Sequence, residues 1–530
     1  MKFSIQRFTR LNLFFIVSIF VVTTMVFFSG AKLSFLNSVL ILIVSGTVSN
    51  LIIGIKKDTL LLNSLSIINF CLLIFLSQLF IDLTFDGQAY HQEMMIQMAN
   101  GWNPMFEFID KTNNQSIWVN HYSKGYEVIG AVFYSFTKSI TAVKFINTIF
   151  LGLSFLYPFL YFKKNNGTIK AILIALIVAC NPVTLTQLMT NLIDGFLYCV
   201  TIITFFSYLL SKEERKYLVD FVFGFILLIN IKFTGVVFGV ALYGAIICYN
   251  LIVEKKKTSF FLKRVAFTLL IVAPFLYSPY IKNYSEKGHP FYPLMGANNI
   301  DFVDEYVPDV LKNKNKVEKL LYTNFVSIGN RGDSKLKIPF TFTLNELQKL
   351  RNGAPRVGSF GVWWGGILLV SILYYLISII KIRQKFKFSV FEFIIAIILL
   401  LLFFNKAGWW LRYTPYFWLI PLLLILSINR YKNDKKEFKI LFYLVTINAV
   451  FTLIVSLGLG YKDSELFKEK LRNLKETNYT YKVDFDAYLG NKALFKEYNI
   501  PFYESKSKTF LKPKAFNNVV IIETDIKDDK

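Results

Sequence analysis

Long apolar runs, separated by short polar turns, repeat along most of this chain. Runs such as 235–253 and 388–404 are nearly free of charge over about the length that a helix needs to cross a bilayer. Core helices of a soluble protein alternate buried and exposed positions, and these runs do not. The pattern therefore predicts an all-α polytopic membrane protein.

Thirteen transmembrane helices are expected from these runs. The first run is long for a cleaved signal peptide, so we expect it to be a retained span. The predicted spans cover residues 11–29, 34–55, 61–81, 141–162, 169–189, 195–210, 217–233, 235–253, 262–279, 360–381, 388–404, 413–428 and 438–459.

The positive charges are concentrated in the short turns. The formal net charge of +24 would by itself also suit a nucleic-acid-binding protein. Lysines and arginines in short loops, however, mark the cytoplasmic side of a membrane protein. We therefore expect no nucleic-acid partner and a multi-pass protein of the bacterial cell membrane, with a cytoplasmic N-terminus and an extracytoplasmic C-terminus. The basic turns are Lys56-Lys57, Lys163-Lys164, Lys212 to Lys216, Lys255 to Lys257, Lys381 to Lys387 and Arg430 to Lys439.

Three hydrophilic segments, residues 82–140, 280–359 and 460–530, are too long to be turns. All three fall on the outer face when the spans are counted from a cytoplasmic N-terminus. The chain thus combines a helical membrane core with large extracytoplasmic loops. Because the additional mass lies on one side, we expect the protein to work there.

The first and last of these segments have regular patterns of their own. In the first, Met94, Met95 and Met98 share one face of a predicted helix, which we expect to lie flat in the membrane interface. The last has helical patterns near 464–476 and 490–498 and an apolar strand at Val519 to Glu523. These elements predict a small α/β segment at the C-terminus.

Motifs that bind nucleotides or metals are missing from the sequence. There is no GxGxxG, GxxxxGK[ST] or HExxH, so no nucleotide is expected as a ligand. The histidines match no pattern of zinc ligands, and ordinary polar residues in wet loops are the simpler interpretation. No metal site is assigned, although a divalent metal cofactor stays possible. The histidines are His91, His121 and His289.

Two aspartates stand at the outer ends of spans. Asp86 follows the third span in Phe-Asp-Gly-Gln-Ala-Tyr-His, where a carboxylate beside apolar surface is poorly solvated and suited to act as a general base. Asp194 lies in the outer turn between the fifth and sixth spans. Each can instead serve as the N-cap of the helix that follows; neither interpretation is favoured for Asp86, and the N-cap is favoured for Asp194.

Three basic side chains also lie at the outer ends of spans, against the usual bias of topology. Lys232 follows the seventh span, Arg356 precedes the tenth, and Arg412 lies between two late spans. One explanation is that the side chains reach out to lipid headgroups. The other is that they bind an anionic group, for which arginine offers a bidentate fork. The first is favoured for Lys232, and neither is favoured for the two arginines.

Several short motifs resemble the GT-C superfamily of polytopic membrane glycosyltransferases, such as protein mannosyltransferases and aminoarabinose transferases. The likeness covers residues 60–430 or so. It rests on an acidic residue past an early span, a Tyr-His pair and a helix that ends in Gly-Trp-Asn-Pro. Further motifs similar to those of the family are Lys232-Phe-Thr-Gly235, His289-Pro-Phe-Tyr-Pro293, Gly358-Ser-Phe-Gly361 and the Arg412-Tyr413 pair before Pro415.

The resemblance implies sugar transfer on the outer face from a polyprenyl-phosphate-linked donor to a glycan, lipid or protein acceptor. The acidic residue of the family corresponds to Asp86, followed here by Gly87 where some relatives have a second acid. Residues 1–60 would be a two-helix extension, 61–459 the GT-C-like core and 460–530 a small extracytoplasmic domain.

A mechanism follows from the resemblance and the residues together. Asp86 would deprotonate the acceptor, and the attack would invert the anomeric carbon. Positive charge would stabilise the leaving phosphate. The expected phosphate-binding residues are Arg412, Arg356 and Lys232, and the expected pocket residues are Asp194, Tyr90, His91, His289 and Tyr292.

Two other functions fit the same pattern. A polymerase or ligase of surface polysaccharide also has many spans and a large outer loop, and would work without a catalytic carboxylate. A transporter or flippase of lipid-linked sugars is disfavoured, because the sequence has neither an internal repeat nor charges deep within the spans.

Overall fold

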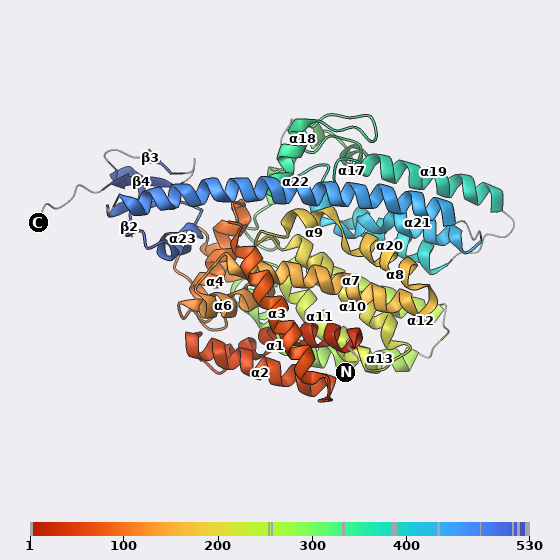
Figure 1. The fold of residues 1–530 in the computed structure, drawn as a ribbon, viewed down its shortest axis with the longest axis horizontal. Helices are drawn as coiled ribbons and strands as arrows, with labels where there is room; N and C mark the ends of the chain where they lie inside the picture. The colour runs from red at the N-terminus through yellow and green to blue at the C-terminus, as the bar shows by residue number, and fades with distance from the viewer. Residues whose placement is uncertain are drawn as a thin grey trace, which may run out of the picture.

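Helices make up most of the structure and form one elongated bundle (Figure 1). The computed structural model describes residues 4–252, 255, 258–330, 334–353, 355–382, 389–431, 435–477, 479–510, 514–516 and 520–524. The long helices of the bundle are α1 (Ile5–Phe28), α2 (Phe35–Ile53), α3 (Thr59–Gln78), α7 (Phe145–Asn165), α8 (Thr168–Ala179), α10 (Asp194–Ser211), α11 (Tyr217–Ile231), α12 (Phe233–Ile252), α13 (Thr258–Val272), α19 (Trp364–Ile382), α20 (Val390–Phe404), α21 (Ile420–Asn429) and α22 (Lys435–Glu476).

Nine helices in the described part of the chain are long and apolar enough to cross a membrane. The other four predicted spans fall on shorter apolar helices: α8, α11, α20 and the stretch Pro415–Asn429. The structure is thus mostly helical with little sheet, as expected for a helical membrane protein. The count of thirteen spans stays a prediction.

The fifth predicted span, 169–189, is interrupted. Helix α8 ends at Ala179, and a short helix, α9 (Pro182–Gln187), follows after a break. Proline has no N–H to donate and forces the preceding residue out of the helical region, and Asn181 is accordingly extended. The Asn181 side chain accepts a hydrogen bond from the Val183 N–H and so caps α9.

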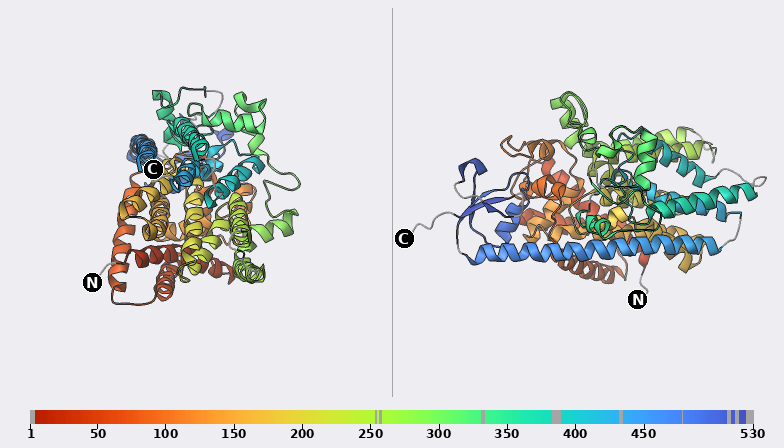
Figure 2. Two further views of the ribbon diagram at one scale, coloured as in Figure 1. Left: turned by 90° about the vertical axis from the view of Figure 1, so that its right-hand side faces the viewer. Right: turned by 90° about the horizontal axis from the view of Figure 1, so that it is seen from above.

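The last predicted span, 438–459, and the helical pattern at 464–476 belong to a single helix. Helix α22 has 42 residues and is about 60 Å long, twice the thickness of a bilayer core. It contains no proline that would end it. Figure 2 shows α22 running along the side of the bundle and carrying the C-terminal strands beyond it.

Helices near the N-terminus differ in how much of their surface the bundle covers. Most residues of α1 are buried, whereas only a minority of those of α2 and α3 are. In α1, Arg10 forms a buried ion pair with Asp220 of α11, with Nε and Oδ1 2.9 Å apart. Helix α1 therefore packs inside the core. The division of the chain at residues 60 and 459 stays a prediction.

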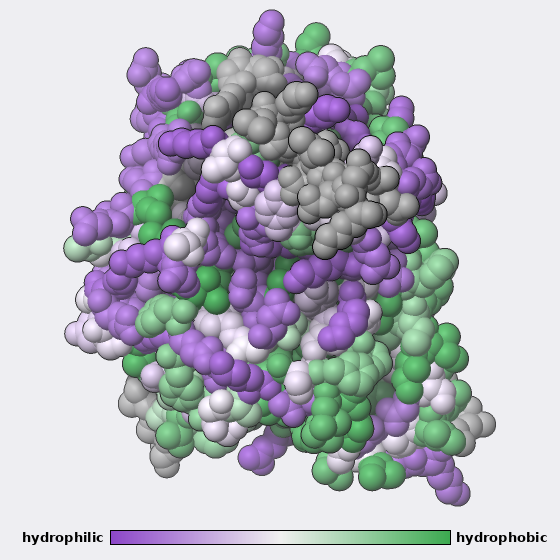
Figure 3. Space-filling view, turned by 90° about the vertical axis from the view of Figure 1, so that its left-hand side faces the viewer, coloured by the Kyte–Doolittle hydropathy of each residue, from purple (hydrophilic) through white to green (hydrophobic). Residues whose placement is uncertain are grey.

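The three long hydrophilic segments meet at one end of the bundle. Asn283 of the second contacts His121 of the first, with Oδ1 and Nδ1 2.9 Å apart. Gly490 of the C-terminal segment donates its N–H to the Gln88 carbonyl of the first, at 2.8 Å. Figure 3 shows this end to be mostly hydrophilic, with apolar residues gathered toward its lower and right edges.

The basic turns that the structure describes lie together elsewhere. Lys164, after α7, pairs with Glu213 and Glu214 before α11, both at 2.8 Å. Arg7 pairs with Asp58, between α2 and α3, at 2.8 Å. This separation agrees with the predicted sidedness, and which end is cytoplasmic stays a prediction. Three basic turns lie partly outside the described residues: Lys255 to Lys257, Lys381 to Lys387 and Arg430 to Lys439.

The predicted interfacial helix is instead buried in protein. Helix α4 (Gln92–Ala99) packs against α6 (Gly125–Thr137), and even its polar Glu93 is fully buried. Asn113 and Gln97 donate hydrogen bonds to the Glu93 carboxylate, both at 2.7 Å. These internal partners explain why an amphipathic pattern does not place this helix in the lipid interface.

Short helices complete the segments between spans. The first contains η1 (Gly87–His91) and α5 (Ser116–His121), and η2 (Ala142–Lys144) directly precedes α7. Helix α13 is followed by η3 (Ala273–Leu276) and η4 (Tyr277–Ile281), and the second segment contains α14 (Lys282–Lys287), α15 (Phe302–Glu305), α16 (Asp309–Lys312), α17 (Lys316–Asn324), α18 (Leu344–Lys349) and η5 (Leu350–Asn352). Between α20 and α21 lie η6 (Leu411–Tyr413) and η7 (Pro415–Leu419).

The C-terminal segment after α22 forms a small α/β unit, which we call the cap. It consists of β1 (Tyr481–Asp484), α23 (Asn491–Glu497), β2 (Phe502–Glu504), η8 (Ser507–Thr509), β3 (Lys514–Ala515) and β4 (Ile521–Thr524). The strand order is β2-β1-β4-β3, with β1 parallel to β2 and antiparallel to β4. The expected helix is α23, and the expected strand is β4, except that Val519 lies outside the described residues.

Candidate functional site

Asp86 lies on an irregular segment between α3 and α4. After α3 ends at Gln78, residues 80–84 have no regular secondary structure, and Asp86, which has helical backbone angles, directly precedes the π-helical turn η1. The Asp86 side chain makes no capping hydrogen bond to this turn. The N-cap interpretation is therefore wrong for the side chain, which is 28 % exposed and directed elsewhere.

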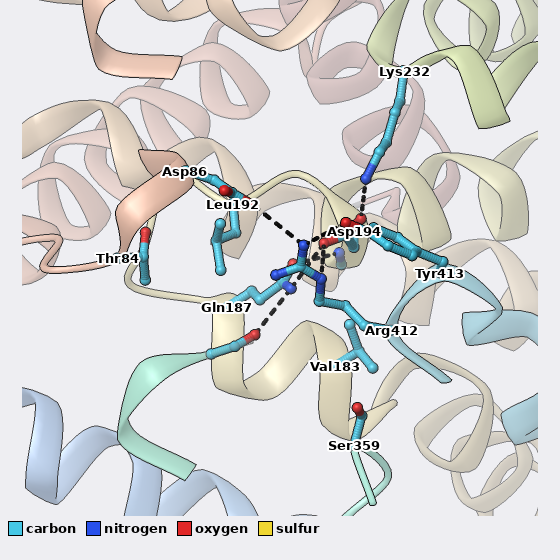
Figure 4. Close-up of polar contacts among 12 residues, drawn as sticks. Thr84, Asp86, Val183, Gln187, Leu192, Asp194, Lys232, Ser359, Arg412 and Tyr413 are labelled. Carbon is cyan, nitrogen blue, oxygen red and sulfur yellow. Dashed lines mark hydrogen bonds and ion pairs between the residues drawn. The ribbon is translucent and has the colours of Figure 1, made fainter. Parts of the chain in front are cut away.

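Four of the predicted charged residues form one network at this end of the bundle (Figure 4). Arg412 joins two carboxylates, with Nη2 3.2 Å from Asp86 Oδ2 and Nε 3.1 Å from Asp194 Oδ2. Lys232 Nζ lies 2.6 Å from the other Asp194 oxygen. Residues more than three hundred positions apart in the chain are thus held in contact.

Asp194 is the buried centre of this network. It is the first residue of α10, but its side chain makes no capping hydrogen bond, so the N-cap interpretation is wrong here too. Besides Lys232 and Arg412, it accepts a hydrogen bond from Gln187 Nε2 at 3.2 Å. Gln187 also donates to the Gly353 carbonyl at 3.0 Å. Paired with two cations, a carboxylate can remain charged although it is buried.

Lys232 does not reach out to solvent or headgroups, as the favoured interpretation supposed. Its side chain is 9 % exposed and points inward to Asp194, between α11 and α12. The ammonium group also lies over the Tyr413 ring, 4.2 Å from the centroid. Both contacts hold the cation inside the protein.

Arg356 approaches the same network through aromatic side chains. Its guanidinium carbon lies 4.5 Å from the Tyr306 ring centroid and 5.7 Å from that of Trp410. The guanidinium carbon of Arg412 lies 5.3 Å from the same Trp410 ring. Trp410 thus contacts both arginines, and its buried Nε1–H has no hydrogen-bond partner in the described part of the chain.

Tyr90 belongs to an aromatic cluster beside Asp86. Its ring lies 6.0 Å from those of Trp118 and Tyr122, and Tyr122 packs at 5.0 Å against Phe233, the neighbour of Lys232. Burial, followed by the Asp86 charge, raises the pKa of Tyr90 well above its ordinary value. The Tyr90 hydroxyl therefore stays protonated and can act only as a neutral hydrogen-bonding group.

A cavity of about 230 Å³ adjoins the Asp86 segment. Its walls come from that segment, from α9 and from α22, with Arg351 contributed by η5. The lining includes both apolar side chains and hydroxyl groups. The lining residues are Phe80, Ile81, Leu83, Thr84, Leu185, Thr186, Met189, Thr190, Arg351, Ser456, Leu457, Gly460 and Asp463. Only Phe85 stands between Thr84, which lines the cavity, and Asp86 in the sequence.

The remaining predicted pocket residues are not part of the network. His91 is buried, and its Nδ1 lies 2.5 Å from Glu127 Oε1. Tyr292 packs edge-on against His121 at 4.9 Å, where the two outer segments meet. Burial lowers the pKa of His121 to about 4, so this imidazole is neutral near pH 7.

His289 contacts its own loop, accepting a hydrogen bond from the Phe291 N–H at 3.1 Å. Phe291, which the sequence did not single out, packs at 5.7 Å against Phe233 beside Lys232. Within the motif His-Pro-Phe-Tyr-Pro, it is therefore the phenylalanine whose ring packs beside the charged network.

Three further residues of the site had not been expected. Asp82 accepts hydrogen bonds from the Thr84 N–H at 2.9 Å and the Asn191 N–H at 2.7 Å, and so ties the Asp86 segment to the loop before Asp194. Burial raises the pKa of Asp82 above its ordinary value. The spacing Asp-x-Thr, typical of an Asx-turn, was the available signal. No sequence signal pointed to Gln187 or Trp410.

No cluster of three or more histidine, cysteine, aspartate or glutamate side chains within the described residues could hold a metal ion. Within the network, Arg412 bridges the two carboxylates, Asp86 and Asp194.

Comparisons with family models, with curated proteins and with solved structures find no match for this chain. The resemblance to GT-C glycosyltransferases therefore rests on the motifs of the sequence alone.

Proposed function

We propose that the protein is a membrane glycosyltransferase that moves a sugar from a polyprenyl-phosphate-linked donor to a hydroxyl acceptor at the outer face. The observation that carries the proposal is Asp86, a partly exposed carboxylate held at the edge of a network of buried cations, on a segment whose preceding residues line a cavity. Such a site offers a proton acceptor and positive charge for an anionic leaving group within a few ångströms of each other.

Asp86 acts as the general base. Its Oδ2 has one contact to Arg412 at 3.2 Å, and the side chain is far more exposed than those of Asp194 and Arg412. An acceptor hydroxyl beside Asp86 gives up its proton to the carboxylate while its oxygen attacks the anomeric carbon. The bond to the donor phosphate breaks on the opposite side, so the configuration inverts.

Arg412 and Lys232 stabilise the departing phosphate. The Arg412 nitrogens Nη2 and Nε contact the two carboxylates, and Nη1 makes no hydrogen bond in the described part of the chain. One guanidinium edge is thus available to a phosphate oxygen. Positive charge fixed in a largely buried site stabilises a developing anion more strongly than it would in water. Arg356 would extend this cationic surface beyond Trp410.

Asp194 keeps the two cations in place before the donor arrives. It contacts both Lys232 and Arg412, so the four charged groups of the network sum to zero in the empty site. Without that carboxylate, two buried cations would face each other. The Asp194 side chain is therefore a positioning group in this mechanism.

Localisation in the cell membrane follows from the same proposal. A lipid-linked donor reaches the site by diffusing in the outer leaflet, and no nucleotide is required. The acceptor is a glycan, a lipid or a protein on the extracytoplasmic side, the N-terminus is cytoplasmic and the cap is extracytoplasmic.

The test is mass spectrometry of envelope glycans in a strain that lacks the gene, complemented with variants. We expect the deletion to lose one sugar from a glycan, lipid or protein, and the wild-type gene to restore it. Asp86→Asn should restore about 10² to 10⁴ times less product at equal protein level, the usual contribution of a general base.

Asp110→Asn is the matched control, because this aspartate lies in the same outer segment and is exposed. It should restore the product fully. Full restoration by Asp86→Asn would reject a catalytic carboxylate and leave the polymerase or ligase alternative. A deletion that alters no glycan would reject the proposal as a whole.

A further inference from the structure

The segment that carries Asp86 is fastened by the C-terminal quarter of the chain. Before Asp86, the part of α22 that extends past the apolar region contacts this segment twice. Lys468 Nζ donates to the Leu79 carbonyl at 2.8 Å, and the Ile81 N–H donates to Ser464 Oγ at 2.8 Å. Ser464 is fully buried, so the Ile81 N–H has no access to water as an alternative partner.

After Asp86, the cap contacts the π-helical turn. The Gly490 N–H donates to the Gln88 carbonyl at 2.8 Å, and Asn491 Nδ2 donates to Gln88 Oε1 at 3.0 Å. Gln88 and Asn491 are both buried. The Phe85 and Tyr488 rings meet edge to face, 5.5 Å apart. Polar contacts thus lie on both sides of Asp86, within seven positions of it.

Gly490 must be glycine for the cap to approach this closely. Gln92 is the first residue of α4, and a Cβ atom at residue 490 would lie 2.0 Å from its Oε1. Gln92 cannot easily move away, because its Nε2 donates to Asn191 Oδ1 at 2.9 Å. The backbone of the cap is therefore fitted against the start of α4.

The local structure of the Asp86 segment makes such support necessary. A π-helical turn is a rare conformation, and the Asp86 side chain adds no capping bond to it. The direction of the carboxylate then depends on what holds residues 79–92 in place. Asp82 fixes the inner side of the segment, through Asn191, and the C-terminal quarter fixes the outer side.

We propose that the extension of α22 and the cap are a positioning element, in which Ser464, Gly490 and Asn491 set the Asp86 carboxylate against Arg412. Its consequence for sugar transfer rests on the proposed function, whereas the fastening of the segment does not. A misplacement of about 1 Å in a reacting group can slow a reaction about a hundredfold. The cap thereby becomes part of the working enzyme although it is remote from the apolar core.

Hydrogen–deuterium exchange of the full-length protein in detergent tests the fastening. Gly490→Ala and Ser464→Ala should each speed exchange in the peptide that covers residues 79–92 about tenfold, the effect expected from losing one or two buried hydrogen bonds. Lys496→Ala, on the exposed face of α23, is the matched control and should leave exchange unchanged. Unchanged exchange in both test variants would overturn the proposal.

Product formation in the complemented deletion strain tests the consequence. Gly490→Ala and Ser464→Ala should lower product about ten- to a hundredfold at wild-type protein level and melting temperature. Ser464→Thr, which keeps the accepting hydroxyl, should restore both product and slow exchange. Faster exchange with full product would overturn the positioning role. If Asp86→Asn also leaves product unchanged, the proposed function fails while the exchange result still reports on the fastening.

Discussion

Two charged clusters within the same fold use similar residues in opposite ways. In the first, Arg10 of α1 pairs with both oxygens of Asp220 at 2.9 and 3.1 Å, and Tyr157 donates to the same carboxylate at 2.8 Å. In the second, Arg412 pairs with Asp194 and, through one longer contact, with Asp86. Both clusters bring distant helices together, and both contain an arginine that is almost fully buried.

The clusters differ in the exposure of their carboxylates. Asp220 is fully buried and has partners for both oxygens, so no group is left to meet a substrate. Asp86 is 28 % exposed, has a single ion-pair contact and lies near a cavity. A buried pair with every atom satisfied is a structural feature. An exposed carboxylate at the edge of buried cations is available for chemistry, and this contrast is the basis for assigning the function to the second cluster.

The largest effect on stability is expected from breaking the fully buried cluster around Asp220. Asp220→Asn leaves Arg10 charged and buried without a counter-ion, and the loss of one partner of a buried pair costs about 3–5 kcal/mol. Asp86→Asn removes one partly exposed contact and should cost about 1 kcal/mol or less. Thermal unfolding of the purified variants measures both. Equal destabilisation by the two substitutions would contradict the distinction between the clusters.

A somewhat smaller effect is expected at Glu497, a mostly buried carboxyl group of the cap that forms no ion pair in the described part of the chain. It accepts hydrogen bonds from the Ile140 N–H at 2.6 Å and the Ser139 hydroxyl at 3.3 Å. Burial raises the pKa of Glu497 to about 7, against the lowering effects of these two bonds and of the Lys144 charge. The folded chain therefore holds a proton that the unfolded chain has already lost.

The sign of the pH dependence follows from this raised pKa. The contribution of protonated Glu497 is complete below the ordinary pKa of glutamate and is lost as the pH rises through about 7, a change of about 3 kcal/mol. Glu497→Gln should match the wild type near pH 5 and be more stable near pH 8. Melting temperatures across this range check it, and a constant difference would contradict a titration at Glu497.

The smallest of these effects concerns the geometry of Arg412. Arg412→Lys keeps the charge but loses the planar fork that joins Asp86 to Asp194. We expect product to fall about ten- to a hundredfold, with little change in protein level. Arg215→Lys is the control and should leave product unchanged, because this arginine is exposed in the turn between α10 and α11. Full product from Arg412→Lys would contradict this account, because it would show that the positive charge is sufficient without the planar fork.

The sequence allowed most of the network to be predicted, because residues at the ends of spans are restricted in both depth and side. Asp86, Asp194, Lys232 and Arg412 all stand at such ends, and the structure brings them into contact. Sidedness is a property of the order along the chain, so counting spans was sufficient to group them.

Side-chain direction was not predictable in the same way. His91 follows Tyr90 directly, yet the turn of η1 directs it into the core toward Glu127. In the second segment, Phe291 rather than Tyr292 comes near Lys232, because Tyr292 packs against His121. These choices depend on packing between segments that are far apart in the chain, which periodicity does not report.

The most direct measurement of the central claim is the amount of polyprenyl-phosphate-linked sugar in strains that carry Asp86→Asn or the wild-type gene. If Asp86 is the base that lets an acceptor attack this donor, the variant strain will accumulate the lipid-linked sugar while its glycan product disappears. A donor pool that stays at the wild-type level while the product is lost would contradict transfer from a lipid-linked sugar at this site.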